Sequence, residues 1–260
     1  MKKPRVGIFK FTSCDGCQLS ILNLEDELLK IIELTEISYF REAQDAPENM
    51  GAGCAGIAPF DLAIVEGSIS TEWQKRDLLD IRERSKLLMT IGACATAGGV
   101  QALRNWADVS EFGKNEYPNP SAIEALPAST PISDHVHVDY ELWGCPIDSA
   151  EFSEALASFL IGKTPGLPAY SLCMECKRKG IPCVLVARQA PCLGPITRAG
   201  CGVLCPSAAR ACYGCFGPKE GANIKALMDI FQGFGFSEDE RRMMLDKINT
   251  YKFREAEEKG

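Results

Sequence analysis

Cysteine is the residue type in this 260-residue chain whose number and spacing could do chemistry. Eight of the 13 cysteines lie in a 43-residue stretch that begins and ends with a C-x-x-C pair. These eight are Cys173, Cys176, Cys183, Cys192, Cys201, Cys205, Cys212 and Cys215. Each iron of a four-iron cubane takes one terminal thiolate, so eight thiolates are the number that two such clusters require.

A second, sparser set of cysteines lies upstream. Cys14 and Cys17 form another C-x-x-C pair, whereas Cys94 and Cys145 stand alone in a cysteine-poor region. Each of the four has a glycine within two residues, and glycine lets the backbone approach an inorganic sulfide closely. The four predict a third cluster and leave Cys54, which we interpret as a bystander in a loop. Three clusters in one chain indicate a path for electrons.

Zinc is the alternative metal for the eight clustered cysteines. Two four-cysteine zinc centres need the same eight thiolates, and C-x-x-C pairs do not distinguish zinc from iron. The spacing also differs from the C-x2-C-x2-C-x3-C run of bacterial ferredoxins, so that simple carrier fold is not supported. A zinc-stabilised interaction protein therefore stays open as a hypothesis beside the iron–sulfur one.

Composition excludes some classes of protein. A net charge of −7 and the lack of a Lys/Arg-rich stripe along the sequence argue against a nucleic-acid surface. No segment has the roughly 18 uninterrupted apolar residues of a membrane span. The apolar run Val6–Phe11 is too short for an export signal and contains Lys10. We therefore predict a cytoplasmic protein. Thiols are kept reduced in that compartment, so a dense set of cysteines there indicates metal sites more often than disulfides.

The elements that must position these cysteines follow an alternating pattern over the first 165 residues. Apolar, β-compatible runs predict strands at 5–11, 36–40, 61–66, 86–91 and 135–140, and helical periodicity predicts helices at 19–32, 73–85 and 149–161. Such alternation is typical of a doubly wound α/β fold with a parallel sheet. Ligands of these sheets collect beyond the carboxyl ends of the strands, where Cys14, Cys94 and Cys145 are expected to converge.

A second domain is predicted after a Gly- and Pro-rich boundary near residues 162–168, which divides the chain into 1–165 and 166–260. Residues 173–217 are expected to have little regular structure and to be held together by metal. The tail predicts one helix at 222–232. A second begins with a capping box of Ser237 and Glu240, runs to about residue 253 and leaves the last seven residues frayed.

Three other polar residues lie on predicted strands. His135 and His137 alternate on one face of the strand at 135–140, and we interpret them as structural. Glu66 ends a buried strand beside the expected cluster face. It is either a solvated strand end or a contact to a partner subunit or proton path, and the sequence leaves both open.

Six motifs in order give the chain a resemblance to a known family. They are Thr12–Gln18 (TSCDGCQ), Val65–Gly67 (VEG), Gly92–Cys94 (GAC), Gly144–Pro146 (GCP), Pro191–Pro195 (PCLGP) and Cys212–Cys215 (CYGC). Over nearly its whole length the chain resembles the small, electron-transfer subunit of nickel–iron hydrogenases. That resemblance implies a flavodoxin-like domain at 1–165 and a loop-rich iron–sulfur domain with C-terminal helices at 166–260.

The resemblance also implies three sets of ligands to 4Fe-4S clusters. The proximal set is Cys14, Cys17, Cys94 and Cys145; the medial set is Cys201, Cys205, Cys212 and Cys215; the distal set is Cys173, Cys176, Cys183 and Cys192.

Two of these positions depart from the membrane-associated, exported members of the family. Those members use a histidine as a distal ligand where this chain has Cys173, and they commonly carry a three-iron medial cluster where Cys205 supplies a fourth thiolate here. Two cubanes resemble instead the cytoplasmic branch, and the chain is most similar there to the delta subunits of NADP-linked bifunctional (sulf)hydrogenases.

The function implied by this resemblance is an electron relay. Nothing in the chain resembles the paired C-x-x-C motifs that hold nickel and iron, so hydrogen is expected to be cleaved on a large-subunit partner. Electrons would enter at the proximal set and pass the medial set to the distal set. The expected acceptor is a flavin- and NAD(P)-binding diaphorase-type subunit, together with a further iron–sulfur subunit.

Two alternatives stay open. The same relay could serve a heterodisulfide reductase or polysulfide, because the acceptor is determined by other subunits. The chain could also be an iron–sulfur subunit of a non-hydrogenase oxidoreductase. Quinone-reducing respiratory complexes contain a relative of the N-terminal domain, but that relative carries adjacent paired cysteines, which this sequence lacks.

Overall fold

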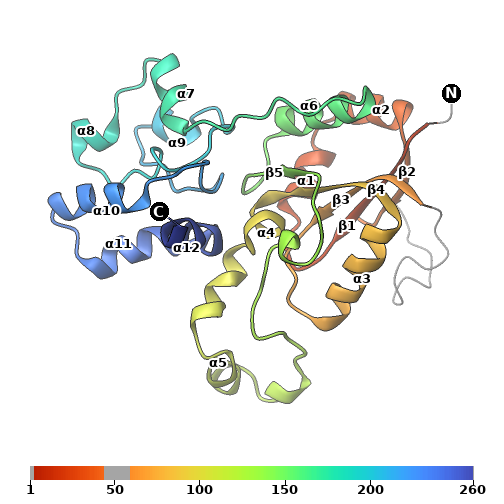
Figure 1. Ribbon diagram of the computed structural model, residues 1–260, viewed down its shortest axis with the longest axis horizontal. Coiled ribbons are helices and arrows are strands. Elements are labelled where there is room, and N and C mark those ends of the chain that lie inside the picture. Colours follow the sequence, from red (N-terminus) through yellow and green to blue (C-terminus); the bar gives the residue numbers. More distant parts are fainter. Residues whose placement is uncertain (1–2, 44–58, 260) are drawn as a thin grey trace.

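A five-stranded parallel sheet is the centre of the protein (Figure 1). The structure is a computed structural model that describes residues 3–43 and 59–259, so Cys54 lies outside the described residues. Its strands are β1 (Arg5–Lys10), β2 (Glu36–Phe40), β3 (Phe60–Glu66), β4 (Ser85–Ile91) and β5 (Tyr140–Leu142). They lie in the order β2-β1-β3-β4-β5, and every neighbouring pair is parallel.

Helices and short 3-10 turns (η) connect the strands, and α6 follows the last one. They are α1 (Gly16–Leu22), α2 (Asp26–Leu34), α3 (Glu72–Glu83), α4 (Gly92–Ala97), η1 (Val100–Trp106), α5 (Val109–Glu116), η2 (Pro120–Ala122), η3 (Ile132–Asp134) and α6 (Ser149–Leu160). The helix predicted at 19–32 is two helices, α1 and α2, and those predicted at 73–85 and 149–161 correspond to α3 and α6.

Both faces of the sheet are buried, which is why its strands read as continuous apolar runs. In β3, Leu62 and Ile64 belong to the core beneath α1, α2 and α6, whereas Ala63 and Val65 belong to the core beneath α3. Successive side chains of a strand point to opposite faces, so β3 needs helices on both sides. Figure 1 shows α1, α2 and α6 on one side of the sheet and α3 on the other. The predicted doubly wound α/β fold is confirmed.

The strand order places a switch point between β1 and β3. From β1 the chain crosses to β2 on one side, and later strands are added on the other side through β3, β4 and β5. The connections diverge at such a point, and ligands gather beyond the carboxyl ends of the strands there. Four of the motif cysteines follow these ends in the chain, after β1, β4 and β5.

The predicted strand at 135–140 is wrong in its extent, because β5 begins only at Tyr140. Asp139 marks the transition. Its backbone N–H donates to the Leu88 carbonyl (2.9 Å), and its carboxylate accepts from the Leu88 N–H (2.8 Å). Upstream, the N–H of His135 donates to the Ile132 carbonyl (3.0 Å) in a 3-10 turn. A local turn therefore satisfies the backbone hydrogen-bonding groups of a segment that the alternating sequence pattern had assigned to the sheet.

The C-terminal part has little regular structure around its cysteines, as predicted. Its helices are α7 (Leu172–Arg178), α8 (Val184–Arg188), α9 (Leu204–Ser207), α10 (Ile224–Gly233), α11 (Glu238–Leu245) and α12 (Thr250–Lys259). The first three are short and surround a small core that includes the buried cysteines Cys192 and Cys212. The last three form a separate apolar core around Phe231 and Phe253.

The last predicted helix begins as expected but is not continuous. The capping box is present, because Ser237 N–H donates to Glu240 Oε2 (2.8 Å) and Glu240 N–H donates to Ser237 Oγ (3.3 Å). The helix ends at Leu245, and Asn249 occupies the break. Its buried side-chain amide donates to the Gly214 carbonyl (2.8 Å) between two of the cysteines. Residues 254–259, which were predicted to fray, belong to α12.

Helix α12 joins the C-terminal part to the sheet-containing part. The Tyr251 hydroxyl donates to Asp134 Oδ2 (2.6 Å), and the guanidinium of Arg254 lies 4.0 Å above the ring of Trp106. The division at residues 165/166 stays a prediction. Across residues 3–43 and 59–259, no helix combines the length and apolar character that crossing a membrane requires.

Core packing around β4 gives a test of the sheet. Leu88 is fully buried in β4, whereas Leu79 on α3 is 48% exposed. Leu88→Ala removes buried methyl groups and leaves a cavity, a change that costs about 2–5 kcal/mol. We expect the melting temperature of the cluster-loaded protein to fall by about 5 °C or more, since each kcal/mol is worth about 2–4 °C at this size. Leu79→Ala is the matched control and should shift it by less than about 2 °C. Equal shifts would contradict this core assignment.

Candidate metal centres

The structure brings the four upstream cysteines together at the carboxyl edge of the sheet. Cys14 lies in the loop after β1, Cys17 in the first turn of α1, Cys94 in α4 directly after β4, and Cys145 just after β5. The Cys145 thiol lies within electrostatic range of Cys14, Cys17 and Cys94. Cysteines as far apart in the sequence as residues 14 and 145 therefore share one site, as the sheet topology predicts.

Burial dominates the chemistry of these thiols. It raises the pKa of Cys17 well above the ordinary value, and the charge of Glu66 and then of Cys94 and Cys145 adds to the effect. Burial likewise raises the pKa of Cys94 to about 11, with Cys145 and Cys14 adding to it. Several thiolates cannot coexist in such a site unless a positive centre replaces their protons. The donor set thus fits an iron–sulfur cluster, whose irons supply that charge.

Gly92 is required by the closeness of this packing. Its φ is +81°, and a Cβ at this position would overlap the Cys17 sulfur. The next residue is tied to the loop of the fourth cysteine, because Ala93 N–H donates to the Gly144 carbonyl (2.7 Å). A glycine was expected here to allow close approach to the cluster, and the structure shows the close approach to one of the cysteine sulfurs.

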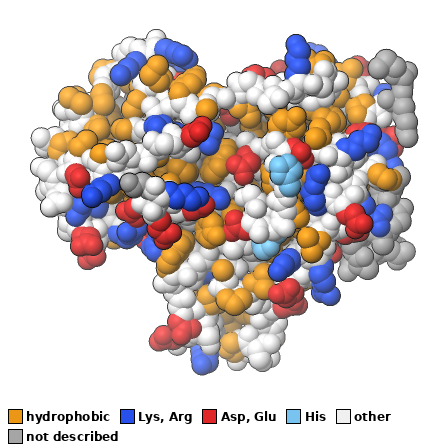
Figure 2. Space-filling view, viewed as in Figure 1, with side chains coloured by type: hydrophobic (Ala, Val, Ile, Leu, Met, Phe, Trp, Pro, Cys, Tyr) orange, Lys and Arg blue, Asp and Glu red, His pale blue; other side chains and the backbone are white. Residues whose placement is uncertain are grey.

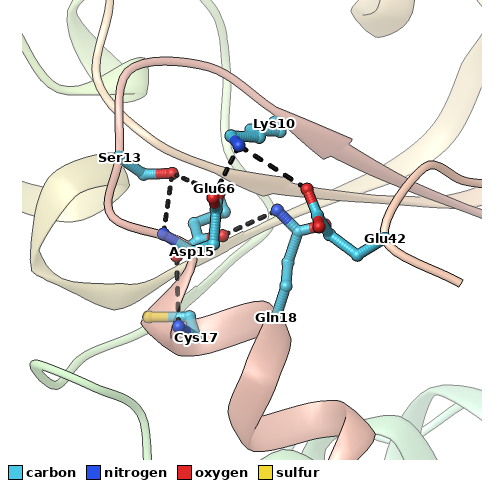
Figure 3. A network of polar contacts seen from close by, with 7 residues as sticks. All are labelled: Lys10, Ser13, Asp15, Cys17, Gln18, Glu42 and Glu66. Carbon is cyan, nitrogen blue, oxygen red and sulfur yellow. Dashed lines mark hydrogen bonds and ion pairs between the residues drawn. The ribbon is translucent and has the colours of Figure 1, made fainter.

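Glu66 holds the start of α1 (Figure 3). Its Oε1 accepts from the Cys17 backbone N–H (3.1 Å), and its Oε2 accepts from Gln18 Nε2 (2.7 Å). The residue is 1% exposed, which excludes the solvated strand end, and burial raises its pKa. Because β3 ends at Glu66, the carboxylate fixes Cys17 to the central strand. A contact to a partner or proton path stays a hypothesis.

An ion pair fixes the other side of the same loop. Lys10 Nζ donates to Asp15 Oδ2 (2.6 Å) and lies 3.5 Å from Glu42 Oε1 (Figure 3). Asp15 stands between the two cysteines of the C-x-x-C pair with a φ of 66°. Ser13 Oγ also donates to its Oδ1 (3.2 Å). The left-handed turn at Asp15 is therefore held by Lys10 of β1 and by Ser13 within the loop itself.

Gln101 is a site residue that the sequence did not reveal. Its Nε2 donates to the Thr12 carbonyl (2.7 Å) and to Ser68 Oγ (2.8 Å), and its Oε1 lies 3.9 Å from the Cys94 sulfur. It thereby connects the loops after β1 and β3 with α4. No local signal identifies it, because its partners are brought near only by the sheet.

The cysteines of the first half of the C-terminal field form a second group around α7 and α8. Burial raises the pKa of Cys176 to about 11, and the charges of Cys173, Cys192 and Cys183 contribute next. Burial and then Cys192 and Cys183 raise the pKa of Cys173. Gly194 packs between two of them, since a Cβ there would lie 3.4 Å from the Cys192 sulfur and 3.6 Å from that of Cys173. The four predicted distal residues therefore lie together.

The remaining cysteines form a third group. Burial raises the pKa of Cys215 to about 12, followed by the charges of Cys201 and Cys205. Burial also raises the pKa of Cys212 to about 12, followed by the charge of Cys192 and then by that of Cys215. The Gly214 N–H donates to the Cys212 sulfur (3.4 Å), a bond that favours a thiolate or metal ligand there. The four predicted medial residues are thus neighbours.

The third group lies between the other two. Cys145 of the upstream group raises the pKa of Cys215, after burial and the two nearer cysteines. On the other side, the Cys212 N–H donates to the Cys192 sulfur (3.2 Å). The groups therefore follow the order upstream cysteines, Cys201–Cys215, Cys173–Cys192.

The spacing of the thiols bears on zinc. Within the described ranges, no three His, Cys, Asp or Glu side chains are gathered closely enough to hold one metal ion. Four thiolates on a zinc ion share one centre at about 2.3 Å each. Those of a cubane bind four different irons and stand further apart. Metal analysis distinguishes zinc from iron at these sites.

The two histidines lie apart from this chemistry. His135 Nε2 is hydrogen-bonded to Thr130 Oγ1 (2.7 Å), and burial lowers its pKa. His137 is exposed and lies 3.6 Å from Asp139 Oδ1. These contacts agree with the interpretation of both residues as structural.

Comparison with known proteins gives a family match to the sheet-containing part. The family model described as NADH ubiquinone oxidoreductase, 20 Kd subunit, matches residues 14–159. Two relatives match most of the chain. The sulfhydrogenase 2 subunit delta of Pyrococcus furiosus is 34% identical over 228 residues, which is 88% of this chain and 92% of that protein. A vhu subunit of the F420-non-reducing hydrogenase of Methanocaldococcus jannaschii is 33% identical over 245 residues, covering 83% and 82% respectively.

A solved hydrogenase structure also contains a chain that is similar to this one. One chain of an NAD+-reducing [NiFe]-hydrogenase, crystallised in the H2-reduced state, superposes with a TM-score of 0.55 at 25% identity. The match covers 64% of this chain and 96% of that chain.

The contact between Gly92 and Cys17 gives a direct test of the upstream site. Gly92→Ala places a methyl group where the Cys17 sulfur lies. We expect anaerobically purified protein to lose roughly four irons per chain, the content of one cubane.

Gly162→Ala is the matched control, because Gly162 has a φ of +67° but nothing within 4 Å of an added Cβ. It carries the same kind of backbone strain without the overlap, and its iron content should be unchanged. Equal iron in the two variants would show that Gly92 does not protect the site. Circular dichroism should show native helix content in both.

Proposed function

The chain belongs to the family of the 20 Kd subunit of NADH ubiquinone oxidoreductase, together with the small subunits of nickel–iron hydrogenases, and from this membership we propose that it is the electron-relay subunit of a hydrogenase with three 4Fe-4S clusters. The catalytic nickel–iron centre of that enzyme belongs to the large subunit, to which this chain supplies electron transfer.

The arrangement of exposed thiols is the observation that carries this proposal. Of the twelve cysteines in the described ranges, Cys14 and Cys183 alone are exposed. They lie in the two outer groups, while the group between them has no exposed member. A relay needs this pattern: an accessible group at each end, and a connected, shielded group in the middle.

The chain's residues would hold the three clusters as follows. The proximal ligands are Cys14, Cys17, Cys94 and Cys145; the medial ligands are Cys201, Cys205, Cys212 and Cys215; the distal ligands are Cys173, Cys176, Cys183 and Cys192. Bound clusters supply one-electron redox centres whose potentials depend on hydrogen bonds to sulfur and on solvent exposure. The chain contributes to both properties. The Gly214 amide donates a hydrogen bond to a ligand sulfur, Glu66 orients Cys17 through its backbone N–H, and burial of the cysteines excludes water.

The family description by itself would also fit a respiratory enzyme, since the model covers the sheet-containing part alone. The hydrogenase assignment is favoured by relatives that also span the C-terminal part, where eight of the cysteines lie. An iron–sulfur subunit of a non-hydrogenase oxidoreductase is therefore the weaker alternative.

For the acceptor, we propose a flavin- and NAD(P)-binding subunit of the diaphorase type, with a further iron–sulfur subunit. The similarity to a chain of an NAD+-reducing hydrogenase supports this choice. Transfer to polysulfide or to a heterodisulfide reductase is the alternative, since other relatives are named as a sulfhydrogenase and as F420-non-reducing hydrogenases. The cytoplasmic location stays a prediction.

Metal analysis of the native complex tests the proposal as a whole. The chain is purified anaerobically from its own host with the proteins that bind it. We expect about twelve irons per chain, four for each cubane, and nickel in a co-purifying subunit. Iron without nickel would agree with an electron relay but contradict its assignment to a hydrogenase. Zinc in place of iron would contradict both assignments.

The medial ligand set is tested at Cys205. Cys205→Ala removes one thiolate, so we expect the iron content to fall by about one to four per chain and the medial signal in the electron paramagnetic resonance spectrum to change.

Cys54→Ala is the control for this variant, because Cys54 is predicted to be a bystander. Its iron content and spectrum should equal those of the unmodified protein. Unchanged iron in Cys205→Ala would show that the medial assignment is wrong.

A further inference from the structure

Positive charge is concentrated around the distal cysteines, although the chain carries −7 in total. Residues 173–210 contain six Lys or Arg and one acidic residue, Glu175. Five of the six basic residues are exposed: Lys177, Arg178, Lys179, Arg188 and Arg210. They come from α7, α8 and the segment after α9, so the fold gathers charges that the sequence spreads over 34 residues.

These five cations are not neutralised by the part of the chain that the structure describes, where none of them forms an ion pair. Several of them instead donate to neutral acceptors. Lys179 Nζ donates to the Gly202 carbonyl (2.7 Å), and Arg188 Nη1 donates to that of Ala209 (3.2 Å). Arg178 donates to the Tyr170 hydroxyl (2.9 Å). Three of the positive charges are therefore held in place and remain available to a partner.

Apolar side chains are exposed among these cations. Val186 is 79% exposed and Leu204 is 74% exposed, and both lie on short helices whose opposite sides pack on the cysteine core. Met174 on α7 is 43% exposed. Figure 2 shows hydrophobic side chains beside Lys and Arg side chains over α7 and α8, at the upper left. Apolar residues beside charged ones are typical of a protein-binding surface.

The exposed thiol Cys183 lies next to this surface, directly before α8. We propose that the surface formed by α7, α8 and α9 is the docking site of an acidic redox protein, which would exchange electrons with the distal cluster that Cys183 helps to hold. The inference rests on the proposed relay function, in which Cys183 is a distal ligand.

The chemistry of the surface defines this partner. Fixed cations favour a partner with carboxylates around its own redox centre, because complementary charge raises the rate of association. The exposed Val186 and Leu204 favour a folded protein over a nucleic acid, whose backbone would leave them unpaired. The remainder of this chain is acidic, which would repel the same partner from other faces.

Electron transfer to an acidic probe protein tests the docking site. The complex of this chain with its large subunit, freed of the proposed acceptor subunits, is reduced with dithionite, freed of excess reductant and mixed by stopped flow with an oxidised, acidic bacterial ferredoxin. Lys177→Glu/Arg188→Glu should lower the second-order rate constant at least about tenfold at low salt. At about 0.5 M salt the rate constant should lie within about twofold of that of the unmodified complex, because salt screens exposed charges.

Lys75→Glu/Arg76→Glu on α3 is the matched control, since both residues are exposed and the change in net charge is the same. Its rate constant should stay within about twofold of the unmodified complex. Iron content is measured in all three. Equal rates for the two variants with equal iron would overturn the docking site, as would a loss that persists at high salt.

Two further outcomes separate this inference from others. H2-dependent reduction of benzyl viologen by the unmodified complex tests the relay alone; its absence would contradict the proposed function whatever the ferredoxin results. If Lys177→Glu/Arg188→Glu instead dissociates a dimer of the complex, or abolishes binding of a DNA oligonucleotide, the surface serves another partner and the proposal is overturned.

Discussion

The structure depends on the burial of many thiols close to one another. Burial raises the pKa of Cys94 and Cys176 to about 11 and that of Cys212 and Cys215 to about 12. Neighbouring thiolates in such an environment repel one another, and the twelve described cysteines form no disulfide. Positive metal centres remove this conflict and would also stabilise the fold of the C-terminal field, whose small core includes Cys192 and Cys212.

The parallel sheet solves a different problem, which is to bring distant ligands to one edge. Loops after β1, β4 and β5 carry four cysteines, and β3 between them ends in Glu66 rather than in a ligand. The Glu66 carboxylate accepts the Cys17 amide, and Gly92 leaves space for the Cys17 sulfur. The central strand therefore positions a ligand that the adjacent loop supplies, and an apolar residue at 66 would leave the buried Cys17 N–H without this acceptor.

The two ends of the row of cysteine groups differ in their surroundings. Cys14 is exposed beside the sheet, near the Lys10–Asp15 ion pair, in which the charges are matched. Cys183 is exposed beside cations that have no carboxylate partner among the described residues. An electrostatic difference of this kind can direct different partners to the two ends of one relay.

The sequence by itself determined what depends on residue type and local spacing. The number of thiolates, the alternation of strands and helices and the Ser237–Glu240 capping box are local properties. They predicted the fold class and the convergence of the four upstream cysteines, whereas the division of the other eight into two sets was implied by the family resemblance. Only the tertiary structure decided what depends on distant contacts. Gln101 donates to Thr12 across 89 residues, Asn249 between α11 and α12 donates to the Gly214 carbonyl, and Cys145 lies within electrostatic range of Cys215. Periodicity reports which face of an element is buried, but not which side chain of another element it meets, because that depends on how the whole chain packs.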